Sequence, residues 1–311
     1  MSTLRRLTVL SAAAALATIA SIGTSTAAGS QLNGRWAPFG RCPVDNPAML
    51  AADGINDQAT CIASSSSSGV IKIGSSVVPT GKTDLQAGII THADGTNTVV
   101  APAEGALLAD PADLPGGLLG LMCPSAVPVV SAVCGQITNS TLNRIVATVE
   151  PVGTPKDFAL FAGLGEKQPI ISIPVRIHLE NPLIGGNCYI GTKSSPIVLH
   201  PQNQTVPDVA AESFTANGTA ADTGEMARLA ATGAGQEDTT FAAPGASGCG
   251  PLGLGAFNWA VNLKSGLPAA SGTNSLTLNS ASTYLATLAD PGSAAPNQGR
   301  TFSQYWHSAA K

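Results

Sequence analysis

Apolar and polar residues alternate strictly in the middle of the chain, and this pattern predicts a strand with one buried and one solvent face. The apolar positions are Ile171, Ile173, Val175, Ile177 and Leu179, and the intervening ones are Ser172, Pro174, Arg176, His178 and Glu180. Asn181-Pro182 ends the pattern and residues 185–187 supply a turn. Short strands are expected at 188–190 and 196–199. We therefore place the centre of the core in residues 169–200.

Similar but shorter patterns predict the remaining elements. Strands are expected near residues 60–63, 70–73, 76–79, 83–91, 98–102, 141–152, 158–164 and 276–280, with a hairpin turn at Asp94-Gly95. Residues 103–123 are rich in Leu, Pro and Gly and predict short helical turns over one end of the sheet. Residues 252–263 predict one helix, which Gly266 and Pro268 end. Residues 201–237 hold few large apolar residues; we expect a long surface excursion there rather than a domain linker.

These elements predict a mainly β fold, either an antiparallel sandwich or a distorted barrel, with a few short helices and disulfide bonds. We assign residues 1–28 to a signal peptide and residues 29–311 to a single secreted β-rich domain. Arg5 and Arg6 precede an apolar run from Leu7 to Ile22, and small residues at 24–28 suit signal peptidase. The general secretory route is preferred, because the residues around the two arginines match a twin-arginine signal poorly. No later segment resembles a membrane span.

The six cysteines predict three disulfides, since an even number in an exported chain is typical of a disulfide framework. Fifteen connectivities exist, and the sequential one is favoured because short loops close most easily. Its pairs are Cys42–Cys61, Cys123–Cys134 and Cys188–Cys249. No C-x-x-C motif occurs and the four histidines are far from the cysteines in sequence, so neither a metal site nor a cofactor is expected.

The charge pattern argues against two classes of partner. The chain has 15 Lys+Arg and 19 Asp+Glu, and removing Arg5 and Arg6 leaves a net charge of about −6. No basic run exists, which disfavours nucleic acid and electrostatic docking on anionic lipid. Charged residues are only 11% of the chain. The surface must therefore be built largely of small polar residues, which suits an extracellular or cell-wall-associated protein.

Two groups of residues are candidate ligand contacts. Arg176, His178 and Glu180 form a polar row on one strand face, which could transfer protons; the favoured interpretation is an ordinary solvent face with compensating charges. Phe302, Tyr305 and Trp306, with Trp36, could form a carbohydrate platform. The favoured interpretation of this aromatic tail is that it docks on the domain and buries its rings.

Catalytic motifs give little support for an enzyme, and we assign no catalytic residue. The G-x-S-x-G motif of serine hydrolases is absent, and residues 245–249 resemble it only loosely, with the wrong spacing. Paired carboxylates for glycoside hydrolysis can come from anywhere in a chain. The candidates have no distinctive setting; they are Asp84, Asp94, Glu104, Glu150 and Glu180.

Several segments together resemble a group of secreted actinomycete proteins that have no assigned biochemical activity. The segments are residues 39–43, 60–63, 175–182, 187–191 and 240–249. The resemblance spans nearly the whole mature chain; it implies secretion and supports the Cys188–Cys249 pair, but it supplies no catalytic residue.

The function expected from these observations is non-enzymatic: a secreted or wall-associated binding or structural protein, with a cell-wall polymer or polysaccharide as its partner. A secreted hydrolase of such a polymer is the alternative. A third option is a carrier of an apolar ligand, which requires a sizeable pocket lined by residues 107–122. The sequence predicts no oligomeric state.

Overall fold

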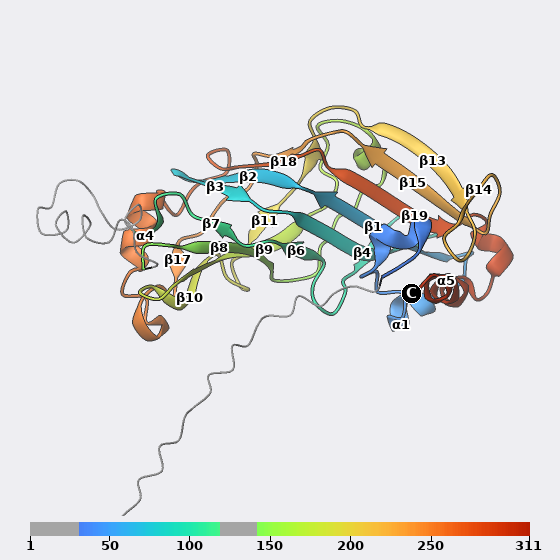
Figure 1. The fold of residues 1–311 in the computed structure, drawn as a ribbon, viewed down its shortest axis with the longest axis horizontal. Helices are drawn as coiled ribbons and strands as arrows, with labels where there is room; N and C mark the ends of the chain where they lie inside the picture. Colours follow the sequence, from blue (N-terminus) through green and yellow to red (C-terminus); the bar gives the residue numbers. More distant parts are fainter. Residues whose placement is uncertain (1–30, 119–141) are drawn as a thin grey trace, which may run out of the picture.

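The computed structural model describes residues 31–118 and 142–311. The predicted signal peptide and the predicted Cys123–Cys134 pair lie outside the described residues. Three antiparallel sheets make up most of the described chain, as the alternating patterns predicted (Figure 1).

The largest sheet has eight strands, in the order β14-β13-β15-β19-β1-β4-β5, with β6 also paired to β4. Its strands are β1 (Asp57–Ser66), β4 (Thr83–His92), β5 (Asn97–Val100), β6 (Leu107–Ala109), β13 (Asp208–Phe214), β14 (Ala220–Ala221), β15 (Met226–Thr232) and β19 (Ser282–Leu288). The five-stranded sheet has the order β12-β16-β18-β2-β3. Its strands are β2 (Ser68–Ile73), β3 (Ser76–Thr80), β12 (Gln202–Asn203), β16 (Gln236–Asp238) and β18 (Ser275–Asn279).

These two sheets are successive halves of one long, bent surface. Five chain segments pass from one sheet into the other: β1 into β2, β3 into β4, β12 into β13, β15 into β16, and β18 into β19. The segments have the same spatial order in both halves. We call the line along which these segments pass from one sheet into the other the waist. Between β15 and β16 this passage lies at Gly233, which has a positive φ.

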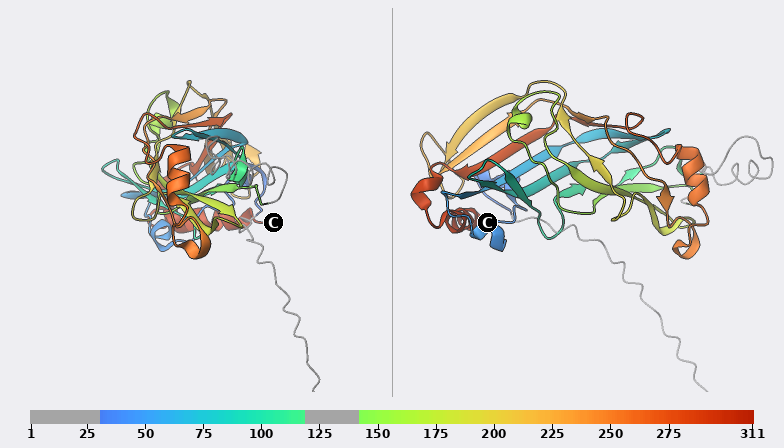
Figure 2. Two further views of the ribbon diagram at one scale, coloured as in Figure 1. Left: turned by 90° about the vertical axis from the view of Figure 1, so that its left-hand side faces the viewer. Right: turned by 180° about the vertical axis from the view of Figure 1, so that it is seen from behind.

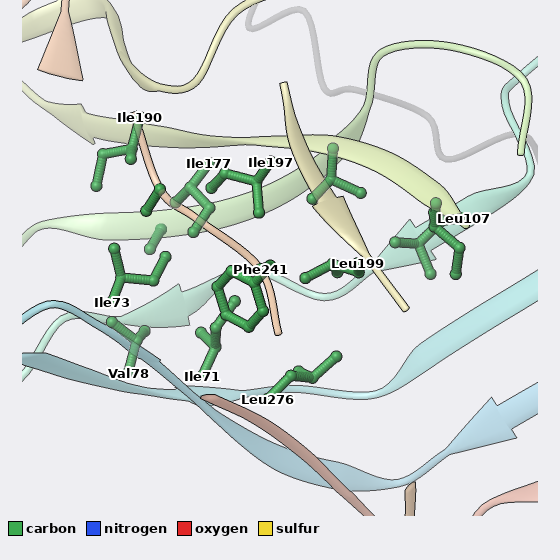
Figure 3. Packing of buried hydrophobic residues seen from close by; sticks show 14 of the residues in the cluster. Ile71, Ile73, Val78, Leu107, Ile177, Ile190, Ile197, Leu199, Phe241 and Leu276 are labelled. Atoms are coloured by element: carbon green, nitrogen blue, oxygen red, sulfur yellow. The ribbon is translucent and has the colours of Figure 1, made fainter. Parts of the chain in front are cut away.

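The third sheet has six strands in the order β17-β10-β9-β8-β7, with β11 also paired to β9. Its strands are β7 (Ala112–Asp113), β8 (Val146–Pro151), β9 (Ile173–Asn181), β10 (Gly185–Ile190), β11 (Ile197–Leu199) and β17 (Ala246–Ser247). It packs against the long surface and encloses the main core (Figure 3). The alternation predicted for β9 is confirmed, because Ile173, Val175, Ile177 and Leu179 are all buried.

The sandwich, not the barrel, is the alternative that the structure shows. No described sheet closes on itself: β5 and β14 are the edges of the eight-stranded sheet, and β3 and β12 those of the five-stranded one. In Figure 3, side chains from the two layers point toward one another, among them Ile177, Ile190, Ile197 and Leu199 on one side and Ile71, Ile73, Val78 and Leu276 on the other.

Helices cap the other face of the eight-stranded sheet, at the end of the molecule where Leu32 pairs with Ala310 (Figure 1). The cap contains η1 (Gly34–Phe39), α1 (Pro47–Leu50) and α5 (Gln298–Ser308). The remaining helices are η2 (Phe161–Leu164), η3 (Pro251–Gly253), α4 (Asn258–Ser265) and η4 (Pro291–Ala294). A second hydrophobic core lies between these helices and the sheet. Alternate residues of β1 belong to it: Ala59, Cys61 and Ala63 face the cap, whereas Ile62 belongs to the main core.

Four sequence predictions are wrong in the described residues. Residues 107–109 and 112–113 form β6 and β7 where helical turns were predicted, because Leu107 pairs with Leu85 in the sheet; residues 119–123 of that prediction lie outside the described part of the chain. Residues 201–237 hold β12 to β16, not a surface excursion. Residues 158–164 contain η2 instead of a strand. The helix predicted from Leu252 begins only at Asn258, since Gly253 and Gly255 have positive φ and interrupt it.

Two predicted disulfides are confirmed. Cys42–Cys61 joins the loop after η1 to β1, and Cys188–Cys249 joins β10 to the segment that follows β17. Among the described residues, no helix has the length and apolar character needed to cross a bilayer. The disulfides fit an oxidising, extracellular location.

A tight turn before β1 predicts a pH-dependent stability. The Asn56 side-chain amide and the backbone N–H groups of Ile55, Asp57 and Asn56 donate to Asp53 and hold the pKa of its carboxyl well below its usual range. Because these hydrogen bonds favour the ionised carboxylate, Asp53 stabilises the fold at pH values above the ordinary pKa of an aspartate. This stabilisation is lost as the pH falls and the carboxylate is protonated. We expect the stability advantage over Asp53→Asn to shrink between about pH 5 and pH 2 in urea titrations; a constant difference would contradict this.

Candidate functional site

The outward face of the six-stranded sheet carries the largest group of charged residues that the sequence singled out. Arg176, His178 and Glu180 lie along one side of β9, as the alternation predicted. Register adds two partners from neighbouring strands: Glu150 of β8 lies opposite Arg176, and Tyr189 of β10 lies opposite His178. We call these five residues the polar cluster.

Arg176 links the strands of the cluster. Its Nε and Nη2 donate to Glu150 Oε2 at 2.8 and 2.7 Å. Its Cζ lies 3.9 Å from the centre of the Tyr189 ring, a cation–π distance. The guanidinium is thus paired with a carboxylate and an aromatic ring at once, and both partners are half-buried.

His178 is fixed on both sides of its ring. Nδ1 lies 3.0 Å from Glu150 Oε1, and Nε2 lies 2.9 Å from the backbone oxygen of Gly186. The imidazole also stacks on Tyr189, with ring centres 4.5 Å apart. Since both ring nitrogens face acceptors within the protein, neither is free to take a proton from a substrate. The geometry suits a positioning role rather than a general base.

A shallow groove of about 560 Å³ lies beside the cluster at the turn between β9 and β10. Its lining consists of Arg144, Val146, Glu180, Asn181, Pro182, Gly185 and Gly186. One basic and one acidic side chain face it together with exposed backbone at the two glycines. A groove with compensating charges and peptide groups suits a polar ligand without net charge.

The structure brings together two of the five candidate carboxylates. Glu150 and Glu180 both approach His178 Nδ1, at 3.0 and 4.0 Å. Glu150 Oε1 and Glu180 Oε1 are therefore at most about 7 Å apart, an upper limit that overlaps the separations of about 5 to 9.5 Å that glycoside hydrolysis uses. Glu150 is held by Arg176, whereas Glu180 is exposed at the groove.

The aromatic platform predicted near the termini does not form on the surface. Trp36 is fully buried and Trp306 is nearly so; their Nε1 atoms donate to Ala216 O and Phe39 O, each at 2.9 Å. Only Tyr305 of the four candidate rings is half-exposed, since Phe302 is also fully buried. The tail instead docks through α5, which is the interpretation that the sequence favoured.

Two other histidines have carboxylate partners, in arrangements unlike a working triad. His307 and Ser303 both bond to Asp45, so serine and histidine do not meet. Asp57, His92 and Thr98 form a relay, with 2.6 Å at Nδ1 and 2.8 Å at Nε2. For this relay to catalyse acyl transfer, free backbone N–H groups nearby would have to stabilise the oxyanion of the intermediate.

The hairpin amides nearest to that relay are already engaged. Gly95 N donates to His92 O, and Thr96 N donates to Asp94 Oδ1. The hydrogen bonds of His92 to Asp57 and Thr98 therefore have a structural role: they connect the strand ends and fix the β4–β5 hairpin. Within residues 31–118 and 142–311, no cluster of three His, Cys, Asp or Glu side chains could hold a metal ion.

An apolar cavity lies at the waist, between the long surface and the six-stranded sheet. Leu85, Leu107, Ile173, Leu199 and Leu276 are among its lining residues. Its volume is about 50 Å³, whereas an apolar cavity of about 150 Å³ is what accommodates benzene. The space at the waist is therefore too small for the apolar ligand that the carrier hypothesis requires.

Tyr189 is the site residue that the sequence analysis missed, although the signal was present. It lies between Cys188 and Ile190, both buried, so alternation places it on the polar face. The resemblance to secreted actinomycete proteins stays a prediction. Comparison of the chain with protein-family models, with curated proteins and with solved structures gave no match.

Proposed function

We propose that this chain is a secreted or cell-wall-associated, non-enzymatic binding protein whose ligand is an uncharged polysaccharide or wall polymer. The observation that carries the proposal is the polar cluster beside the groove, where compensated charges surround the half-buried ring of Tyr189; this ring contacts Arg176 and His178 and does not itself line the groove. Sugars combine hydroxyl groups with apolar ring faces, and such a surface supplies partners for both.

The charges of the cluster favour binding over chemistry. Arg176 and His178 both use Glu150 as a partner, and the second nitrogen of His178 is occupied by Gly186 O. A site prepared for proton transfer needs a group that can reach the substrate proton. The two confirmed disulfides and the low charge of the chain support an extracellular location.

A polysaccharide hydrolase is the second candidate, and the spacing of Glu150 and Glu180 favours it. The exposed Glu180 would act as the acid, and Glu150 as the second carboxylate. Glu150 is held by two hydrogen bonds from Arg176, whereas Glu180 lines the groove. Glu180→Gln separates the two candidates, because it abolishes hydrolysis while preserving size and most polar contacts.

Co-sedimentation of the oxidised mature protein with peptidoglycan, chitin, cellulose and whole cell walls tests the proposal. We expect specific pelleting with one polymer and no soluble fragments. Tyr189→Ala should weaken pelleting about fivefold or more, since loss of a central aromatic contact costs upwards of 1 kcal/mol. Tyr305→Ala, a half-buried tyrosine at the opposite end, is the matched control and should pellet like wild type.

Three outcomes decide between the candidates. Release of fragments that Glu180→Gln abolishes would establish the hydrolase. Equal loss of pelleting in the Tyr189 and Tyr305 variants would show that the polar cluster is not the site. Absence of pelleting with all four materials would contradict the polymer-binding function itself.

A further inference from the structure

The end of the described chain opposite to α5 exposes a group of large apolar side chains (Figure 1). It is formed by α4 and by the chain that leads into it through η3 (Figures 1 and 2). The exposed fractions are 90% for Leu252, 79% for Leu254, 66% for Trp259 and 73% for Leu263. We call these four residues the apolar tip. Four large apolar side chains exposed within twelve residues of one end of the fold mark an interaction surface.

The fold holds these side chains outward on a firm support. Trp259 and Leu263 lie one helical turn apart and share a face of α4, whereas Ala260 and Val261 on the other face are buried. Leu252 adopts a left-handed backbone conformation, with φ of 58°, that leucine rarely takes.

Side-chain and covalent links fix α4 to the sheet below it. Asn262 Oδ1 accepts from Ala246 N at 2.7 Å, and Asn258 Oδ1 accepts from Cys249 N at 2.9 Å. Cys249 is itself bonded to Cys188 of β10. Because the support is rigid, little conformational entropy is lost when the tip binds.

The chemistry of the tip matches hydrocarbon rather than a charged partner. No Asp, Glu, Lys, Arg or His occurs from residue 239 to residue 263, and Lys264 follows directly. An exposed tryptophan and a lysine on the same helix are typical of side chains at the bilayer interface, where the indole lies among headgroups and the lysine stem reaches back to water.

Shape and charge decide between a bilayer and other occupants. Side chains that are about two-thirds or more exposed protrude from the surface, and four of them cover less than the about 800 Å² per partner of a stable protein interface. The mature chain has a net charge of about −6, which disfavours electrostatic attachment to anionic lipid. We propose that the apolar tip inserts into the interfacial region of a lipid bilayer, through apolar contacts and without need of anionic headgroups.

Intrinsic fluorescence provides a direct test with vesicles of zwitterionic phosphatidylcholine. Trp36 and Trp306 are already buried, so Trp259 alone among the three tryptophans can move from water into lipid. We expect a blue shift and quenching by brominated acyl chains, both absent in Trp259→Phe. Binding should change little between 0.05 and 0.5 M salt, roughly, because exposed charges do not drive it.

Flotation with the vesicles locates the surface. The double variant Leu252→Ser/Leu263→Ser should bind about tenfold or more weakly, because both leucines lose their apolar contact. Phe161→Ser is the matched control: Phe161 is 84% exposed but belongs to η2, outside the tip, and its loss should leave binding unchanged.

Each remaining outcome overturns the proposal. Failure of wild type to float, equal loss in the Phe161 variant, or full binding by the double variant would each show that the tip is not a lipid-binding surface. The result is independent of the polysaccharide proposal, since the tip variants retain Tyr189 and the polar cluster and should pellet with polymer like wild type.

Discussion

Replacing Trp36 with alanine is expected to lower the free energy of unfolding by about 4 kcal/mol, because truncating a fully buried tryptophan removes its apolar contacts and leaves a cavity. The indole is the centre of the second core. Phe214 and Phe302 each pack edge-on against it with ring centres 5.4 Å apart, and Phe39 does so at 6.1 Å. These three rings come from distant parts of the chain, so the cavity weakens β13, α5 and η1 together.

A second tryptophan supplies the control for this measurement. Trp259 is mostly exposed, and Trp259→Ala should change the free energy of unfolding by only about 0.5 kcal/mol or less. Urea titrations followed by far-ultraviolet circular dichroism give both values without relying on tryptophan emission. Similar losses in the two variants would mean that Trp36 does not organise the core at the termini.

Strands with large apolar side chains could be predicted from the sequence, whereas strands built of small side chains could not. β9 was predicted correctly because large β-branched and aliphatic residues alternate there with polar ones, and the structure buries them in the same rhythm. β13 and β15 were missed because their sequences are rich in alanine. Small side chains give a weak periodic signal, and these strands form because neighbours supply the pairing: residues 226–231 of β15 pair with β19.

The same reasoning explains which parts of the candidate site were predicted. A single strand reveals which of its own residues share a face, so Arg176, His178 and Glu180 were grouped correctly. It does not reveal the register of its neighbours, so the meeting of Glu150 with Arg176 and of Tyr189 with His178 required the structure. The groove depends on the β9–β10 turn and on Arg144, which is distant in sequence.

The aromatic residues near the C-terminus allowed two interpretations, of which the favoured one, docking on the domain, is the one that the structure shows. A tail containing Phe302, Tyr305 and Trp306 has the residues of a sugar-binding platform and equally those of a docked amphipathic helix. Helical spacing places Phe302 and Trp306 on one face of α5, and both are buried against Trp36 and Phe39. Burial of these large rings in the second core removes them from the surface on which a sugar platform would need them.

Arg41→Ala is the second substitution with a large expected effect, a loss of about 3–5 kcal/mol in the free energy of unfolding, as for other buried ion pairs that lose one partner. The Arg41 side chain is only 4% exposed. Its Nε and Nη2 donate to Asp84 Oδ2 at 3.0 and 2.9 Å, and its remaining bonds reach the backbone oxygens of Asp84, Gly105 and Ala106. Removing the guanidinium leaves a carboxylate and three carbonyl groups without this donor.

Arg144→Ala is the matched control, because Arg144 forms a single ion pair with Asp113 in which both side chains are more than half exposed. Exposed pairs contribute about 0–1 kcal/mol, so this variant should unfold almost like wild type. Equal losses in the two variants would contradict the role assigned to burial. The comparison also separates the ion pair from the neighbouring disulfide: Cys42–Cys61 remains intact in Arg41→Ala, so the measured loss reports the bonds that attach the loop after η1 to β4 and to residues 105–106.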